Sequence, residues 1–112
     1  MNAFAVNFAS RLRLEDLGAE IAHARRHDDL GRLAALCFCE VRSWATGAGE
    51  QRLADLAWSL CIRAPAANRI AFLARIDRLI AELEEACMRA GIDSLAATLR
   101  VSRRQHPSLA IA

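Results

Sequence analysis

Lysine and tyrosine are missing from the sequence, valine occurs three times and proline only twice. Scarce valine and absent tyrosine remove much of the residue content that favours β-strands. Alanine and leucine, the two strongest helix formers, supply 24 and 15 of the 112 residues instead. Because Leu, Ile, Val and Phe together make 29 residues, the chain can also bury a core. The composition therefore predicts one all-α domain covering residues 1–112.

The charge composition is equally one-sided, because all 15 basic residues are arginine. Exclusive use of arginine is typical of a GC-rich bacterial genome. The 13 acidic residues reduce the net charge to +2. A charge this small excludes a dedicated nucleic-acid coat protein and argues against nucleic acid as the main partner.

A long uncharged apolar run is also missing, because no stretch approaches the roughly 18 residues needed to cross a membrane. The apolar N-terminus MNAFAVNFAS has no basic residue ahead of it and does not fit a signal peptide. No CxxC motif occurs among the four cysteines, which lie in helical patterns as small apolar residues would: Cys37, Cys39, Cys61 and Cys87. We therefore expect reduced thiols in a cytoplasmic protein without a membrane segment.

The longest helical pattern covers Arg69 to Ala90, and we expect the bundle to be organised on this helix. Asn68 before it is a natural N-cap, and Gly91 after it tolerates the left-handed turn that ends many helices. Its acidic residues, Asp77 and Glu84 among them, are predicted on the solvent side. Its apolar residues fall in one arc about 140° wide, namely Phe72, Leu73, Ile76, Leu79, Ile80, Leu83, Ala86, Cys87 and Ala90.

Further helices are expected at about residues 11–27, 30–45, 50–63 and 94–104, which gives four main helices plus a short fifth. Three local signals fix their ends. Asp28 or Asp29 is predicted to cap the second helix, glycines at 47 and 49 to end it, and Asp93 to cap the fifth. The second helix has a surplus, because its apolar residues span about 200°, more than one packing surface requires.

The two ends of the chain are predicted to lie outside these helices. Residues 1–9 form an uncharged apolar arm carrying Phe4 and Phe8, and they fit either an extended strip or a helical turn. We expect the arm to lie on its own domain or to cross to a second subunit. Residues 105–112, which follow the last helical pattern and contain Pro107, are expected to be a loose tail.

Catalytic and metal-binding patterns are sparse. Glu20, His23 and His27 line one polar helix face at spacings used by metal-binding helices, but no second Glu-x-x-His and no HExxH accompany them. No G-x-S-x-G and no glycine-rich phosphate loop occurs either. The sequence therefore predicts a protein that is not an enzyme and has no cofactor and no metal, with the polar face of the helix in solvent.

As an alternative, the chain is a small DNA-binding protein. The stretch of residues 83–104, LEEACMRAGIDSLAATLRVSRR, resembles the second half of a degenerate helix-turn-helix, with a turn at Gly91. Ala97 and Arg100 stand where core residues of that motif are expected. On this hypothesis binding falls steeply with salt and depends on Arg100, Arg103 and Arg104.

The stronger signal is apolar surface beyond what the predicted core uses. Several large apolar residues lie off the main stripes, and a Trp among them is typical of a binding anchor. We expect a homodimer or a partner-binding surface on the side faces of the second to fourth helices. The candidate partner-binding residues are Leu36, Trp58, Ile62, Phe72 and Ile76.

Taken from the Phe4/Phe8 arm to the Arg69–Ala90 helix, the chain resembles the small QslA-type anti-activators of bacterial quorum sensing in size, helical character and surplus apolar positions. The resemblance implies binding to the ligand-binding domain of a LuxR-type transcription regulator such as LasR. It also implies that this binding blocks the regulator's dimerisation and its assembly on DNA. No diagnostic motif accompanies the resemblance, so it assigns no individual residues.

Overall fold

The computed structural model describes residues 3–63 and 65–104, with side chains described for residues 8–63 and 65–103. The described chain is all-α, as the composition predicts. Its elements, in chain order, are α1 (Ala3–Arg26), α2 (Leu30–Ala34), the π-helix η1 (Ala35–Glu40), α3 (Val41–Ala48), α4 (Gln51–Cys61), α5 (Arg69–Arg89) and α6 (Asp93–Arg104). No helix in this part of the chain combines the length and apolarity needed to span a membrane.

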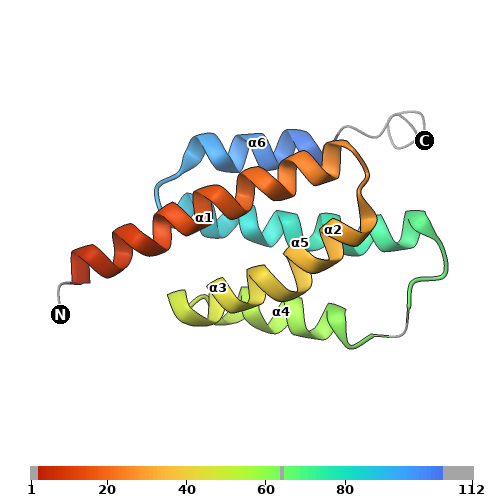
Figure 1. The fold of residues 1–112 in the computed structure, drawn as a ribbon, viewed down its shortest axis with the longest axis horizontal. Helices are drawn as coiled ribbons and strands as arrows, with labels where there is room; N and C mark the ends of the chain where they lie inside the picture. Colours follow the sequence, from red (N-terminus) through yellow and green to blue (C-terminus); the bar gives the residue numbers. More distant parts are fainter. Residues whose placement is uncertain (1–2, 64, 105–112) are drawn as a thin grey trace.

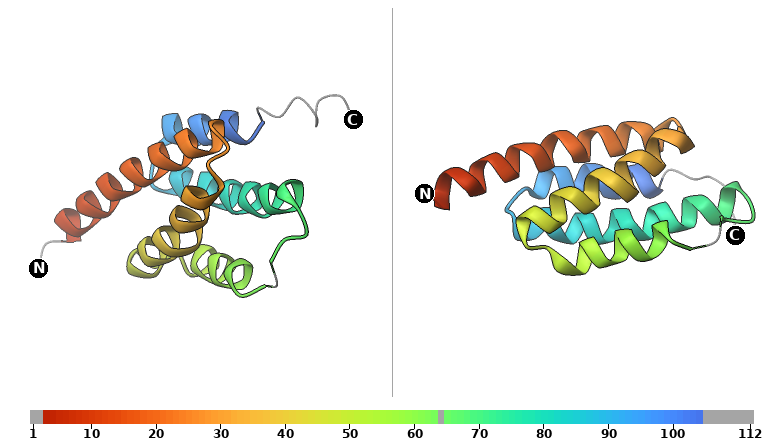
Figure 2. Two further views of the ribbon diagram at one scale, coloured as in Figure 1. Left: turned by 45° about the vertical axis from the view of Figure 1, so that its right-hand side comes forward. Right: turned by 60° about the horizontal axis from the view of Figure 1, so that its bottom comes forward.

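The helices form one bundle with α5 at its centre (Figures 1 and 2). On one side of α5, α6 runs back antiparallel to it and lies against α1. On the other side α4 lies against α5, and the continuous helix made by α2, η1 and α3 connects α1 with α4. The long helix therefore occupies the central place that its sequence predicts. It buries Leu73, Ile76, Leu79, Ile80, Leu83, Ala86 and Cys87.

Both ends of α5 have the caps that the sequence predicts. The Asn68 side chain accepts a hydrogen bond from the backbone N–H of Ala71 at 2.8 Å. At the other end Gly91 has φ +78°, and Ile92 N–H donates to the carbonyl of Cys87 at 2.9 Å. This is the hydrogen-bond pattern of a Schellman turn. Ile92 is buried and supplies the apolar contact that accompanies it.

The second predicted helix contains a π-helical turn over residues 35–40. Asp29 caps its start by accepting from Arg32 N–H at 3.3 Å, and Gly49 ends it with φ +77°. A π-turn inserts one residue and rotates the following helix by about 100°. This rotation brings Val41 and Ala45 into phase with Leu33 and narrows the buried arc of the helix from about 180° to about 120°. The surplus width predicted for this helix is therefore the mark of the inserted residue.

The N-terminal arm belongs to a helix. α1 begins at Ala3, eight residues before the predicted start near residue 11, so residues 3–9 are helical and the extended alternative is wrong for them. Residues 1–2 of the arm and the predicted tail at 105–112 lie outside the described part of the chain. Asp93 is the first residue of α6 instead of its cap, because the Ile92 carbonyl already accepts from Ala96 N–H at 3.2 Å.

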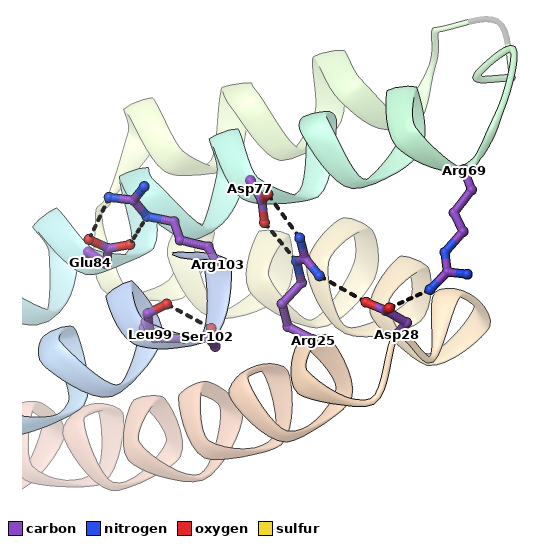
Figure 3. A network of polar contacts seen from close by, with 8 residues as sticks. All are labelled: Arg25, Asp28, Arg69, Asp77, Glu84, Leu99, Ser102 and Arg103. Carbon is purple, nitrogen blue, oxygen red and sulfur yellow. Dashed lines mark hydrogen bonds and ion pairs between the residues drawn. The ribbon is translucent and has the colours of Figure 1, made fainter. Parts of the chain in front are cut away.

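The prediction that the acids of α5 face solvent is wrong for Asp77 and Glu84. Arg25 of α1, only 2% exposed, binds Asp77 with both ends of its guanidinium, Nε to Oδ1 at 2.8 Å and Nη2 to Oδ2 at 3.1 Å (Figure 3). Glu84 is 3% exposed and binds the Arg103 guanidinium of α6. Two ion pairs, each with one buried member, therefore connect α5 to α1 and to α6.

The first of these pairs continues to the end of α1. Arg25 Nη1 lies 2.9 Å from Oδ1 of Asp28, whose other oxygen binds Arg69 at the start of α5. Asp28 has φ +50°, a left-handed conformation that is uncommon outside glycine. Its carboxylate thus joins the end of one helix to the beginning of another while its backbone turns the chain out of α1.

Close packing of α1 against α6 depends on Gly18. A Cβ atom at Gly18 would lie 2.7 Å from Cδ2 and 3.0 Å from Cγ of Leu95. We expect Gly18→Ala to lower the free energy of unfolding by about 2 kcal/mol, because the added methyl group overpacks this contact and the buried side chain of Leu95 must shift. Urea denaturation followed by circular dichroism measures this change. Gly47→Ala is the matched control, because nothing lies within 4 Å of its Cβ position, and it should be neutral or stabilising. Equal effects of both substitutions would contradict the argument.

Candidate protein-binding surface

Two large apolar side chains of α4 are exposed on the same face. Trp58 is 47% exposed, and Ile62, the residue that ends the helix, is 61% exposed. Residues four apart are neighbours on a helix surface. The guanidinium carbon of Arg42, from α3, lies 4.3 Å from the centroid of the Trp58 ring. We call Arg42, Trp58 and Ile62 the Trp58 surface.

The packing of α4 explains why these side chains point outward. Its buried residues follow helical spacing and face the rest of the bundle: Leu53, Ala54, Ala57 and Leu60. Trp58 lies at the flank of this buried stripe, beside α3. Ile62 lies next to Trp58, on the side of the helix that faces away from the buried stripe. The cation above the Trp58 ring holds the indole face by a cation–π contact and gives this apolar surface a positive edge.

Two of the five predicted partner-binding residues are core residues. Leu36 is 4% exposed and Ile76 is fully buried, so neither offers surface to a partner in this conformation. Leu36 looked surplus on an ideal α-helical wheel, but the π-turn places it within the buried arc. Ile76 belongs to a helix that is covered from several sides, by α4, α6 and the η1 region.

Phe72 occupies an intermediate position. It packs against the core and meets Phe38 of η1 edge to face, with ring centroids 6.3 Å apart and an interplanar angle of 82°. Of the predicted set, Trp58 and Ile62 are therefore the residues with substantial exposed surface. Arg42 was not among the residues predicted from the sequence. A signal for it existed, because Arg42 and Trp58 lie at similar sequence separations on either side of Gly49, where the chain reverses.

A second exposed apolar region lies at the N-terminal end of α1. Phe8 is 54% exposed and Leu12 is 46% exposed. Beside them is a groove of about 490 Å³, lined by Phe8, Ser10, Arg11, Trp44, Ala48, Glu50, Arg89 and Ala90. Within this lining the Trp44 indole N–H donates to the Ser10 carbonyl at 2.9 Å and so connects α3 to α1. Glu50 and Arg89, also in the lining, form an ion pair at 2.7 Å.

The polar face of α1, which carries Glu20, His23 and His27, makes contacts with residues near it in the sequence. Glu20 lies 3.3 Å from Arg32, and the His27 ring donates from Nδ1 to the His23 carbonyl at 2.8 Å. The two imidazole rings lie 4.3 Å apart. Within residues 3–63 and 65–104, no group of three or more His, Cys, Asp or Glu side chains has the arrangement to hold a metal ion.

The arginines of the possible helix-turn-helix face the protein itself where they are described. Arg100 lies 3.4 Å from Oε1 of Glu84, and Arg103 binds the same carboxylate. The bond to Glu84 raises the pKa of Arg103. The side chain of Arg104 lies outside the described part. DNA binding by this segment stays a prediction. The contacts of Arg100 and Arg103 with Glu84 do not favour it over other functions.

The cysteines divide into two pairs. Burial raises the pKa of the Cys37 and Cys87 thiols from 9.0 to about 12, with smaller contributions from the charges of Asp77 and Glu84. Cys39 and Cys61 are exposed, and all four thiols are free. The buried pair is therefore protonated at neutral pH and serves as small apolar packing.

Comparison of the chain with protein-family models, with curated proteins and with solved structures yields no match.

Proposed function

We propose that the chain is a small regulatory protein-binding module that acts by stoichiometric occlusion, with the Trp58 surface as its contact site. The observation that carries the proposal is the exposed pair Trp58 and Ile62 beside a cation stacked on the indole. Tryptophan and arginine are the residue types most enriched among side chains that dominate binding energy at protein interfaces. The partner face that suits this surface is apolar at its centre and acidic at its edge.

The partner we propose is a LuxR-type transcription regulator, following the resemblance to QslA-type anti-activators. Binding to its ligand-binding domain would cover the surface through which the regulator dimerises, and so would prevent its assembly on DNA. Burying an apolar anchor such as Trp58 or Ile62 supplies about 1–3 kcal/mol each. The proposal includes self-association of the chain as a homodimer, which the surplus of apolar positions predicts.

The test is a calorimetric titration of the chain into the purified ligand-binding domain of a LuxR-type regulator from the same genome. We expect saturation at one chain per regulator subunit. Trp58→Ala should weaken binding about 30-fold, which corresponds to roughly 2 kcal/mol, because the substitution removes the central anchor.

The matched control is Ile70→Ala, because Ile70 is 76% exposed and lies at the start of α5, outside the Trp58 surface. It should bind like the unsubstituted chain. Circular dichroism of each variant checks that the fold is kept. If the unsubstituted chain does not bind the regulator domain, the partner is wrong. If it binds and Trp58→Ala binds equally well, the surface is wrong.

A further inference from the structure

The first turns of α1 project beyond the rest of the described chain. Both views in Figure 2 and the view in Figure 1 show this end of the helix extending past the other helices. The molecule is accordingly elongated, with principal extents of 49 × 29 × 19 Å. Leu14 is the first buried residue of α1 for which a side chain is described. We call residues 3–12 the overhang.

The composition of the overhang does not suit a helix that stands alone in water. Residues 1–10 carry no charged side chain, and Phe4, Phe8 and Leu12 follow one another at intervals of four. Short helices are marginal in water unless an apolar face is packed against something. Within the overhang Phe8 and Leu12 each expose about half of their surface. Exposed large apolar residues on a projecting helix are typical of a segment that packs against another chain.

The groove beside the overhang has the matching character. Its lining includes the apolar residues Trp44, Ala48 and Ala90. Its three charged residues are each in an ion pair, Glu50 with Arg89 at 2.7 Å and Arg11 with Glu15 at 3.5 Å. The groove therefore presents an apolar surface whose charged residues are paired. The uncharged part of the overhang, residues 3–10, is complementary to such a surface, whereas a charged segment would have to give up its hydration without gaining a partner.

Phe8 belongs to both features, because it projects from the overhang and also lines the groove. A two-fold axis passing beside Phe8 therefore places each copy's overhang against the other copy's groove. Such an isologous arrangement uses the same patch twice and closes on itself. We propose that the occupant of the groove is the overhang of a second copy of this chain, which makes the chain a symmetric dimer through α1.

This inference rests on the homodimer included in the proposed function and concerns a surface separate from the Trp58 surface. The experiment is light scattering coupled to size exclusion over a dilution series of the full chain under reducing conditions. The expected mass is twice the chain mass of 12.3 kDa. Phe8→Arg should reduce the mass twofold, because it places two like charges beside the axis.

A second variant tests the groove without touching α1. Ala48→Arg fills the groove from an exposed position at the end of α3 and should also reduce the mass twofold. The matched control is Val101→Arg, which introduces the same charge at a residue that is 53% exposed on α6 and should stay dimeric. Circular dichroism confirms that each variant is folded.

The outcomes separate this inference from the proposed function. A monomeric unsubstituted chain across the dilution series would overturn the dimer, and a dimer that survives Phe8→Arg and Ala48→Arg would overturn this surface. Trp58→Ala should stay dimeric while losing the regulator domain, and Phe8→Arg should keep the Trp58 surface intact. Loss of dimer mass in Trp58→Ala alone would place the dimer interface on α4 and contradict the inference.

Discussion

Replacing Asp77 by asparagine is expected to lower the free energy of unfolding by about 3 kcal/mol, because it removes the carboxylate that pairs with a buried guanidinium. The side chain of Arg25 is 1% exposed, and Asp77 binds it through two hydrogen bonds at 2.8 and 3.1 Å. The asparagine amide keeps the shape of the carboxylate but not its charge. Arg25 would then stay buried with less compensation for the hydration that it loses on folding. Urea denaturation followed by circular dichroism measures the loss.

Two controls separate charge from packing. Glu82→Gln breaks a surface ion pair with Arg52, whose side chain is 83% exposed, and should cost less than about 1 kcal/mol. The double variant Arg25→Met with Asp77→Leu removes both charges and should recover most of the loss, because an apolar replacement leaves no buried charge behind. If Asp77→Asn costs no more than Glu82→Gln, the buried pair does not hold α1 to α5 in the way described.

The parts of the fold that could be predicted are those set by neighbouring residues. Asn68 and Gly91 specify both ends of α5 through interactions within a few residues, and each is found as expected. The helical content also follows from local propensity, since alanine and leucine have the highest intrinsic preference for helix. Trp58 and Ile62 are exposed because they lie off the apolar stripe of α4, which a helical wheel reveals.

The parts that escaped prediction depend on residues distant in the sequence. Arg25 and Asp77 are separated by 52 positions, so nothing near either residue indicates that they are partners. Glu84 was predicted to face solvent because its helix alone gives no sign of a partner. The partner, Arg103, lies on α6, which packs antiparallel to α5. The π-turn escaped for another reason. Its only sequence signal is an apolar arc that is too wide, and this signal has the same appearance as a binding surface, which is why Leu36 was assigned to the surface and lies in the core.

Alkaline pH is expected to destabilise the protein through its two buried thiols. Burial raises the pKa of both Cys37 and Cys87 from 9.0 to about 12 in the folded chain. Unfolding returns both thiols to water, so above pH 9 the unfolded chain releases protons that the folded chain keeps. The full free energy of unfolding is therefore kept below pH 9. Above pH 9 it falls as the pH rises toward the folded-state pKa, by at most about 3 kcal/mol per pH unit for the two thiols together.

The composition of the chain leaves few other side chains that titrate in the same pH range. Lysine and tyrosine, which titrate near pH 10 in most proteins, are absent from the chain. The reference pKa values of Asp, Glu and His side chains lie well below this range and that of arginine lies above it, so cysteine is the residue type in this chain whose reference pKa falls near it. The measurement is urea denaturation at a series of pH values with a phosphine reductant present, which prevents oxidation of the thiols.

Two double variants assign the effect to the buried pair. Cys37→Ala with Cys87→Ala should be somewhat less stable at neutral pH, because it removes buried atoms, but its stability should change little between about pH 9 and 11. Cys39→Ser with Cys61→Ser removes the exposed thiols and should keep the fall in stability of the unsubstituted chain. If the free energy of unfolding of the unsubstituted chain stays constant to about pH 11, the prediction is wrong. Cys37 and Cys87 would then be more accessible to water in solution than their positions between these helices indicate.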